Sequence, residues 1–167
     1  LHSFPTRRSS DLVSEALFDR LSIQSPDIYI KRIIKKLPDD TMLFFPDEGS
    51  VKRYYNLPKY CGSYAFGIKR RNWVTGKIEG LDVAGDAEKI KGRNILIVDD
   101  ICSKGGTFYH SALKLKELGA TNIYLYVTHC ENSIYDGELL KNNGLIEKIY
   151  TTDSILTNTE SPKIELV

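Results

Sequence analysis

The sequence predicts an α/β fold in which a mostly parallel, twisted sheet carries helices on both faces. Short apolar runs, typical of buried strands, alternate along the chain with segments whose apolar residues recur at helical spacing. The clearest unit is 94–100 (NILIVDD) followed by 107–119 (TFYHSALKLKELG). A strand that leads through a helix into the next strand forms a right-handed crossover, and repeated crossovers build parallel sheets.

Two helices and a strand are predicted in the N-terminal part of the chain. Segment 13–21 (VSEALFDRL) has apolar residues at helical spacing. A second helix begins with Ser25 as its N-cap and Pro26 at its first position, and it ends at Pro38. Residues 41–45 (TMLFF) are all but one apolar and predict a buried strand.

The remaining elements follow from the same periodicities and from glycine and proline breaks. No element is predicted for the tail, 154–167. In chain order the predicted elements are a short helix near 50–57 stopped at Pro58, a strand at 63–70, a strand or hairpin partner at 75–83, the central strand at 94–100, a helix at 107–119 with Gly119 as its stop, a strand at 122–129, a helix near 133–142 and a last strand at 146–153.

Length and composition exclude several classes of protein. A chain of 167 residues predicts one domain, and 41% apolar with 27% charged residues is close to the globular average. The formal net charge of +1 argues against nucleic acid as a partner, and no apolar run approaches the roughly 20 residues that span a bilayer. Cys61, Cys102 and Cys130 lack CxxC spacing, which favours free thiols in a reducing cytoplasm.

The first twelve residues, LHSFPTRRSSDL, differ from the rest of the chain. They show neither helical nor strand periodicity and lack the apolar core of a signal peptide. The string resembles a translated sequencing adapter, and we expect 1–12 to be a non-native segment or else a disordered native terminus. The domain is accordingly predicted to occupy 13–153.

The stretch ILIVDDICSKGGT (95–107) predicts a site for a phosphorylated sugar. A buried strand ends in two carboxylates, Asp99 and Asp100, and a short loop leads through two glycines to Thr107. The following helix offers unpaired N–H groups and a positive dipole to a phosphate, and glycines let the backbone approach it closely. The alternative is a solvated acidic turn. The spacing matches neither a Walker A loop nor GxGxxG.

Other polar residues follow the predicted strands at the same edge of the sheet. Asp47 comes after one strand, and Thr128 and His129 end another. In open parallel sheets ligands bind beyond the carboxyl ends of the strands. His129 is equally compatible with the site and with a hydrogen-bonded structural histidine.

The 95–107 stretch resembles the phosphoribosyl-diphosphate (PRPP) motif of type I phosphoribosyltransferases and PRPP synthetases, which implies a phosphoribosyltransferase-like fold. By this resemblance Asp99 and Asp100 contact the ribose hydroxyls and associated magnesium. The family usually has an acidic residue at the position of Ser103. The residues that would cradle the 5-phosphate are Ser103, Lys104, Gly105, Gly106 and Thr107.

A second segment favours the synthetases. FPDEGSVKRY (45–54) resembles their SPDxGGxxR segment, in which the residue matching Asp47 helps to hold metal and nucleotide. Phe45 and Ser50 depart from that pattern, as in shorter, divergent members. The alternative is a plain helix start, with Asp47 or Ser50 as the cap.

A third segment, GIKRRNWVTGKIEG (67–80), places adjacent cations between a strand and a turn. In PRPP synthetases a Lys-x-Arg pair at this place closes over the phosphates, which assigns the catalytic role to Lys69 and Arg71. Fixed cations stabilise the charge that develops on phosphate oxygens during transfer. The alternative is a solvated basic edge.

Together the three segments resemble the C-terminal part of a ribose-phosphate diphosphokinase. The implied reaction transfers diphosphate from ATP to ribose 5-phosphate, giving PRPP and AMP, with Mg²⁺ held by Asp47 and Asp99. The resemblance also implies a homo-oligomer in the full-length form, ATP contacts from an N-terminal half, and no activity of this fragment alone. A type I phosphoribosyltransferase and a non-catalytic phosphoribosyl-binding regulatory paralogue remain as alternatives.

Overall fold

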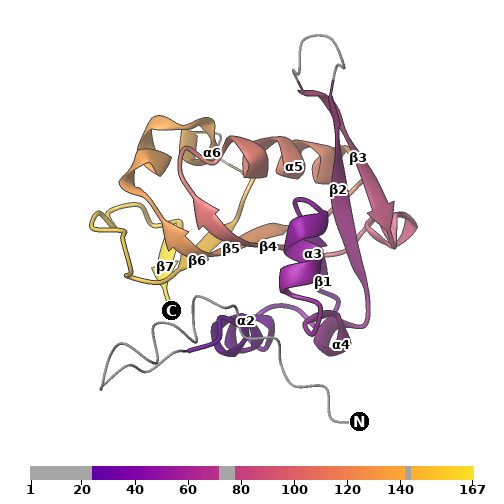
Figure 1. The fold of residues 1–167 in the computed structure, drawn as a ribbon, viewed down its shortest axis with the longest axis horizontal. Helices are drawn as coiled ribbons and strands as arrows, with labels where there is room; N and C mark the ends of the chain where they lie inside the picture. Colours follow the sequence, from indigo (N-terminus) through magenta and orange to yellow (C-terminus); the bar gives the residue numbers. More distant parts are fainter. Residues whose placement is uncertain (1–23, 72–77, 142–143) are drawn as a thin grey trace.

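The computed structural model describes residues 24–71, 78–141 and 144–167, and these form one seven-stranded sheet with the order β3-β2-β1-β4-β5-β6-β7 (Figure 1). β2 and β3 pair antiparallel, and every other neighbouring pair is parallel, which confirms the predicted sheet. The strands are β1 (Met42–Phe45), β2 (Tyr64–Arg71), β3 (Ile78–Gly85), β4 (Ile95–Cys102), β5 (Ile123–Cys130), β6 (Lys148–Thr151) and β7 (Ile164–Leu166).

Helices cover both faces of the sheet, as predicted. Side chains alternate along a strand, so Met42 and Phe44 of β1 join one apolar cluster, while Leu43 and Phe45 join the other. The first cluster contains the buried face of α5, and the second contains that of α2 (Figure 1). The helices are α2 (Asp27–Ile34), α3 (Glu48–Arg53), α4 (Pro58–Cys61), α5 (Gly106–Glu117) and α6 (Glu138–Lys141), with 3₁₀ turns η1 (Ala87–Lys89) and η2 (Asn132–Asp136).

The start of α2 lies one residue later than predicted. Pro26 occupies the N-cap position instead of the first helical position. Ser25 nevertheless caps the first turn, because its Oγ accepts a hydrogen bond from the N–H of Asp27 at 3.3 Å.

The prediction of one helix near 50–57 was wrong, because two short helices occupy this part of the chain. α3 begins at Glu48, since the side chain of Asp47 accepts from the N–H of Ser50 at 3.0 Å and so caps the helix earlier. Pro58 starts α4 instead of ending the preceding helix. Proline is favourable in a first helical turn, where its missing N–H has no intrahelical partner to lose.

The predicted continuous helix near 133–142 was also wrong. Gly137, in extended backbone conformation, separates η2 from α6. A Cβ on Gly137 would lie 1.8 Å from the carbonyl oxygen of Lys104, so the chain is pressed here against the loop that follows β4. The glycine is required by this backbone contact, which helical periodicity does not reveal.

The chain beyond residue 153 adds β7, which pairs with β6 in parallel. Within the described ranges, no helix is long and apolar enough to cross a membrane. The three cysteines carry free thiols. The predictions for 1–12, for the helix at 13–21 and for the turn within 72–77 lie outside the described residues.

Candidate functional site

The acidic pair at the end of β4 is joined to the start of α3 by a serine. The Oγ of Ser50 donates a hydrogen bond to Oδ1 of Asp99 at 2.8 Å, and it lies 3.3 Å from Oδ1 of Asp47. The two carboxylates therefore share one hydroxyl. β1 and β4 are parallel neighbours, which brings the residues following β1 to the carboxyl end of β4.

Asp99 is held through one of its two oxygens. Oδ1 accepts from the Oγ of Ser50, from the N–H of Asp100 at 2.9 Å and from Nη1 of Arg53 at 3.4 Å. Oδ2 receives none of these three donors. The carboxylate is thus oriented by the protein while its second oxygen is left for a ribose hydroxyl or a metal ion.

The pKa of Asp99 is raised above its ordinary value. Burial is the largest cause, since the side chain is only 15% exposed, and repulsion from the carboxylates of Asp100 and Asp47 adds to it. Hydrogen bonds from Ser50 and from the N–H of Asp100 act in the opposite direction. A bound cation would favour the ionised form that this environment penalises.

A hollow of about 440 Å³ contains most of the predicted binding residues. Asp47 follows β1, Asp99 and Ile101 lie in β4, and the other lining residues come from the loop between β4 and α5 and from the first turn of α5. Asp100 does not line it; its Oδ2 pairs with Nη1 of Arg53 instead. The lining residues are Asp47, Asp99, Ile101, Ser103, Lys104, Gly105, Gly106, Thr107 and Phe108.

The loop is shaped by close backbone approaches. Gly105, the N-cap of α5, has φ of +77°, a conformation that glycine adopts without strain. A Cβ on Gly105 would lie 2.9 Å from Cδ2 of Leu139, and Gly137 lies against the carbonyl of Lys104. The η2–α6 segment therefore supports the loop from behind. The first N–H groups of the twelve-residue helix α5 have no intrahelical partner and can bind a phosphate.

The predicted catalytic cations lie on the β2–β3 hairpin. In the ladder Lys69 is opposite Leu81 and Arg71 is opposite Ile78, with a register irregularity between Arg70 and Arg71. The side chains of Lys69 and Arg71 lie outside the described part of the structure, so their role stays a prediction.

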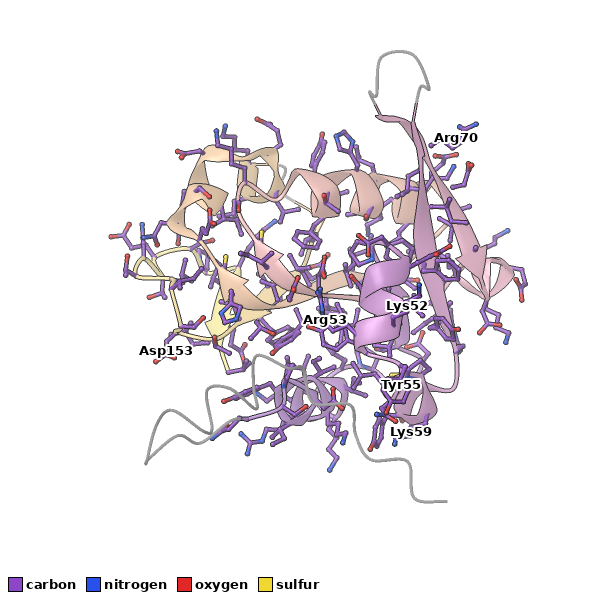
Figure 2. All side chains as sticks on the ribbon, viewed as in Figure 1. Lys52, Arg53, Tyr55, Lys59, Arg70 and Asp153 are labelled. Carbon is purple, nitrogen blue, oxygen red and sulfur yellow. The ribbon has the colours of Figure 1, made fainter. Side chains whose placement is uncertain are left out.

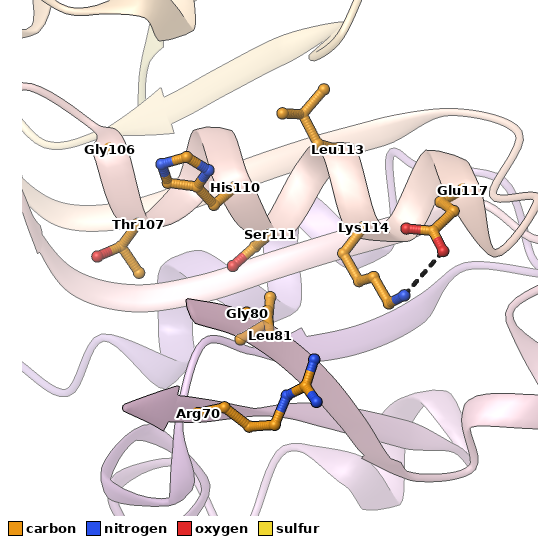
Figure 3. Close-up of a pocket in the computed structure, with 10 residues that line it drawn as sticks. All are labelled: Arg70, Gly80, Leu81, Gly106, Thr107, His110, Ser111, Leu113, Lys114 and Glu117. Carbon is orange, nitrogen blue, oxygen red and sulfur yellow. Dashed lines mark hydrogen bonds and ion pairs between the residues drawn. The ribbon is translucent and has the colours of Figure 1, made fainter. Parts of the chain in front are cut away.

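The hairpin also forms one wall of a second cleft, of about 590 Å³, whose other wall is α5 (Figure 3). Arg70 and Leu81 line the hairpin side, and Lys114 lies on the helix side. Gly106 and Thr107 line both this cleft and the smaller hollow. The hairpin is thereby placed beside the helix start that borders the predicted phosphate site.

His129 is hydrogen-bonded through Nδ1 to Oγ of Ser154 at 2.7 Å. It lines neither the smaller hollow nor the cleft described above. Thr128 contributes its carbonyl oxygen to a hydrogen bond from Oγ1 of Thr152. These contacts favour the structural interpretation of His129.

Two residues of the site were not predicted from the sequence. Ser50 was treated only as a departure from a motif or a cap, and Arg53 was given no role. Both lie on α3, three and six positions after Asp47. Their spacing on a helix that starts at the sheet edge was the available signal, but the partner strand could not be identified from it.

The carboxylates fit a magnesium ion that is shared with a substrate. Within the described residues, no three or more His, Cys, Asp or Glu side chains are grouped to hold a metal by themselves. Mg²⁺ commonly takes one or two carboxylates and completes its shell with water and substrate phosphates. Asp47 and Asp99, bridged by Ser50, offer this kind of donor set.

The fold is an α/β domain with a mostly parallel sheet, as expected from the sequence. The crystal structure of phosphoribosylpyrophosphate synthetase from Mycobacterium smegmatis matches it with a TM-score of 0.67. The match covers 85% of this chain and 46% of that chain, at 19% sequence identity. At this identity the likeness shows a shared fold.

In sequence, the chain is similar to ribose-phosphate pyrophosphokinases, which confirms the resemblance drawn from its motifs. It is 32% identical to the enzyme of that name from Vibrio vulnificus over 125 residues, 73% of this chain and 38% of that protein. It is 30% identical to the one from Shewanella oneidensis over 146 residues, 86% of this chain and 44% of that protein. No protein-family model matches the chain. The chain spans less than half the length of these relatives.

Proposed function

We propose that this chain is the sugar-phosphate-binding part of a ribose-phosphate diphosphokinase, which transfers diphosphate from ATP to ribose 5-phosphate and releases AMP. One observation carries the proposal. An oriented carboxylate, Asp99, faces the same hollow as the glycine-rich start of α5, so that a sugar and its phosphate have adjacent binding groups. The sequence relatives, which bear this activity in their names, support it.

The phosphate of ribose 5-phosphate binds at the loop 103–107. The N–H groups at the start of α5 donate to its oxygens, and the helix dipole favours its negative charge. Lys104 and Thr107 line the hollow, and they add a charge and a hydroxyl donor to the proposed phosphate site. The loop therefore fixes one end of the sugar.

The other end of the sugar meets the carboxylates. Oδ2 of Asp99 accepts from a ribose hydroxyl, and Asp100 accepts from the neighbouring one once its pair with Arg53 opens. Asp47 and Asp99 would hold Mg²⁺, which when bound would neutralise the charge that develops during transfer. Lys69 and Arg71 act on the transferred diphosphate as fixed cations.

Because the chain spans less than half of its relatives, the remaining ATP contacts are assigned to the part of those proteins that it does not match. Accordingly the chain alone binds ribose 5-phosphate but does not form PRPP. The full-length form is proposed to be a homo-oligomer in the cytoplasm.

The binding step can be tested on the chain itself by isothermal titration calorimetry with ribose 5-phosphate and Mg²⁺. The wild-type chain is expected to bind, and Asp99→Asn to bind at least tenfold more weakly. Asp153→Asn is the matched control, since Asp153 is exposed and lies outside the lining of the hollow. No binding by the wild-type chain, or equal binding by Asp99→Asn, would overturn the proposed site.

The activity can be tested by measuring AMP release from ATP and ribose 5-phosphate in a longer protein that joins this chain to an ATP-binding half. Binding without AMP release there would favour the non-catalytic regulatory paralogue. Diphosphate release that depends on an added nucleobase and PRPP would favour a phosphoribosyltransferase.

A further inference from the structure

Arg53, the last residue of α3, lies over both carboxylates of the acidic pair. Its Nη1 is 2.5 Å from Oδ2 of Asp100 and 3.4 Å from Oδ1 of Asp99. The side chains are about one third exposed or less: 32% for Arg53, 15% for Asp99 and 33% for Asp100. Figure 2 shows Arg53 on the side of α3 that faces the central strands, with Lys52 beside it on the helix.

The geometry of the ion pairs between Arg53 and the two carboxylates allows Arg53 to be replaced there by another cation. Both contacts use Nη1 of Arg53, so a single guanidinium nitrogen is shared between the two carboxylates. A two-pronged contact to a single carboxylate would be stronger and more directional. Partial exposure weakens the ion pairs further, because water screens them. Arg53 is thus close enough to offset the repulsion among neighbouring carboxylates without locking them.

A divalent cation at the same two carboxylates would be repelled by the positive charge of Arg53. Mg²⁺ binds oxygen at about 2.0–2.1 Å and brings two positive charges. A guanidinium that remained in contact with the same carboxylates would repel it and would occupy part of its ligand shell. Arg53 and an ion at Asp99 therefore compete electrostatically for the same carboxylate, and the ion is favoured when Arg53 gives up its contact with Oδ1 of Asp99 or Oδ2 of Asp100.

We propose that Arg53 is a positioning residue that acts as an exchangeable counter-ion: it orients the acidic pair in the free protein and is displaced from it by a divalent cation. The inference rests on the proposed function in taking Asp99 and Asp100 as ligand groups. It has two consequences of opposite sign. Arg53 weakens the binding of a free divalent cation, because it competes for the carboxylates. It strengthens binding of the sugar in the absence of metal, because it holds the carboxylates in place.

The test uses Mn²⁺ as the probe, measured as the loss of its free paramagnetic resonance signal on titration with the 167-residue chain, without nucleotide. Arg53→Gln is expected to bind Mn²⁺ about three- to tenfold more tightly than wild type. In metal-free buffer the same variant is expected to bind ribose 5-phosphate about threefold or more weakly by calorimetry. Arg53→Lys, which keeps the charge, should stay nearer to wild type for Mn²⁺.

Lys52→Gln is the matched control, because it removes the same charge from the adjacent, exposed position of the same helix. It should change both affinities by less than about twofold. Thermal unfolding of each variant checks the fold. A damaged site would weaken both ligands together, so the opposite signs separate positioning from a structural role.

Mn²⁺ affinity in Arg53→Gln that is equal to or lower than that of Lys52→Gln would overturn the inference, as would no measurable Mn²⁺ binding in either. Failure of the proposed function looks different. If the wild-type chain does not bind ribose 5-phosphate but Arg53→Gln binds Mn²⁺ more tightly than wild type, the sugar site is refuted. The role of Arg53 as a counter-ion is then still supported.

Discussion

The hydroxyl of Ser50 donates to Oδ1 of Asp99 at 2.8 Å across 49 residues of sequence. This single hydrogen bond ties the start of α3 to the end of β4, and it sets which oxygen of the carboxylate is left for a ligand.

Ser50→Ala is expected to weaken ribose 5-phosphate binding about three- to tenfold, because Asp99 loses a donor that orients it; the loss corresponds to about 1 kcal/mol. The cap of α3 persists, since the N–H of Ser50 still donates to Asp47. Calorimetry measures the change. Ser133→Ala serves as the control, because it removes a comparable bond to Glu131 away from the hollow. Equal effects of the two variants would contradict a specific role for Ser50.

Gly137→Ala is expected to lower both the thermal stability and the affinity for ribose 5-phosphate. The new Cβ would lie 1.8 Å from the carbonyl oxygen of Lys104, so the loop or the η2–α6 segment must shift. We expect a loss of about 1–3 kcal/mol of unfolding free energy, typical of overpacking, and at least a tenfold loss of affinity.

Gly106→Ala is the comparison variant for Gly137→Ala. A Cβ at Gly106 meets no atom within 4 Å, and alanine is favourable in a first helical turn. It should leave the melting temperature unchanged or higher, while narrowing the hollow and weakening binding. If Gly137→Ala melted and bound like wild type, the supporting role of the η2–α6 segment would be wrong.

Asp99→Asn is expected to stabilise the free protein at neutral pH. The pKa of Asp99 is raised in the folded state, so folding favours its protonated form. The unfolded chain binds fewer protons than the folded chain between the two pKa values, and stability therefore falls as pH rises through this window. Above the raised pKa, Asp99 is ionised in the folded protein, and burial of this charge lowers the folding stability by its full amount. The uncharged amide of asparagine avoids this loss.

The measurement is thermal unfolding from pH 4 to 8 without metal. The increase in melting temperature of Asp99→Asn over wild type should be largest near pH 8. It should shrink as the pH falls through the folded-state pKa of Asp99. A constant difference across this range would mean that Asp99 does not titrate as its burial implies.

Lys69→Ala and Arg71→Ala are expected to reduce AMP release at least a hundredfold in a longer protein with an ATP-binding half, because each removes a fixed cation from the transferred group. Ribose 5-phosphate binding by calorimetry should change little. Arg70→Ala is the control, since Arg70 pairs with Asp82 through Nε at 3.1 Å. Comparable losses in all three variants would point to hairpin damage instead.

The strand, loop and helix start around the acidic pair were within reach of sequence analysis for a local reason. The apolar run of β4 and the glycines after it are contiguous, so the strand, the loop and the start of α5 can be recognised together. Asp99 and the loop 103–107 line the same hollow. The breaks at Pro58 and Gly137 were misjudged because one depends on a cap and the other on a distant carbonyl.

The sequence by itself determined the mostly parallel sheet and the chemistry of the strand–loop–helix unit, since periodicity and short-range spacing encode both. Only the tertiary structure decided that Ser50 and Arg53 serve the acidic pair. Those contacts join residues 46 and 49 positions apart, and they exist because β1 and β4 are neighbours in the sheet. Spacing along α3 shows that its side chains share a face. The pairing of β1 with β4 decides which residues that face contacts.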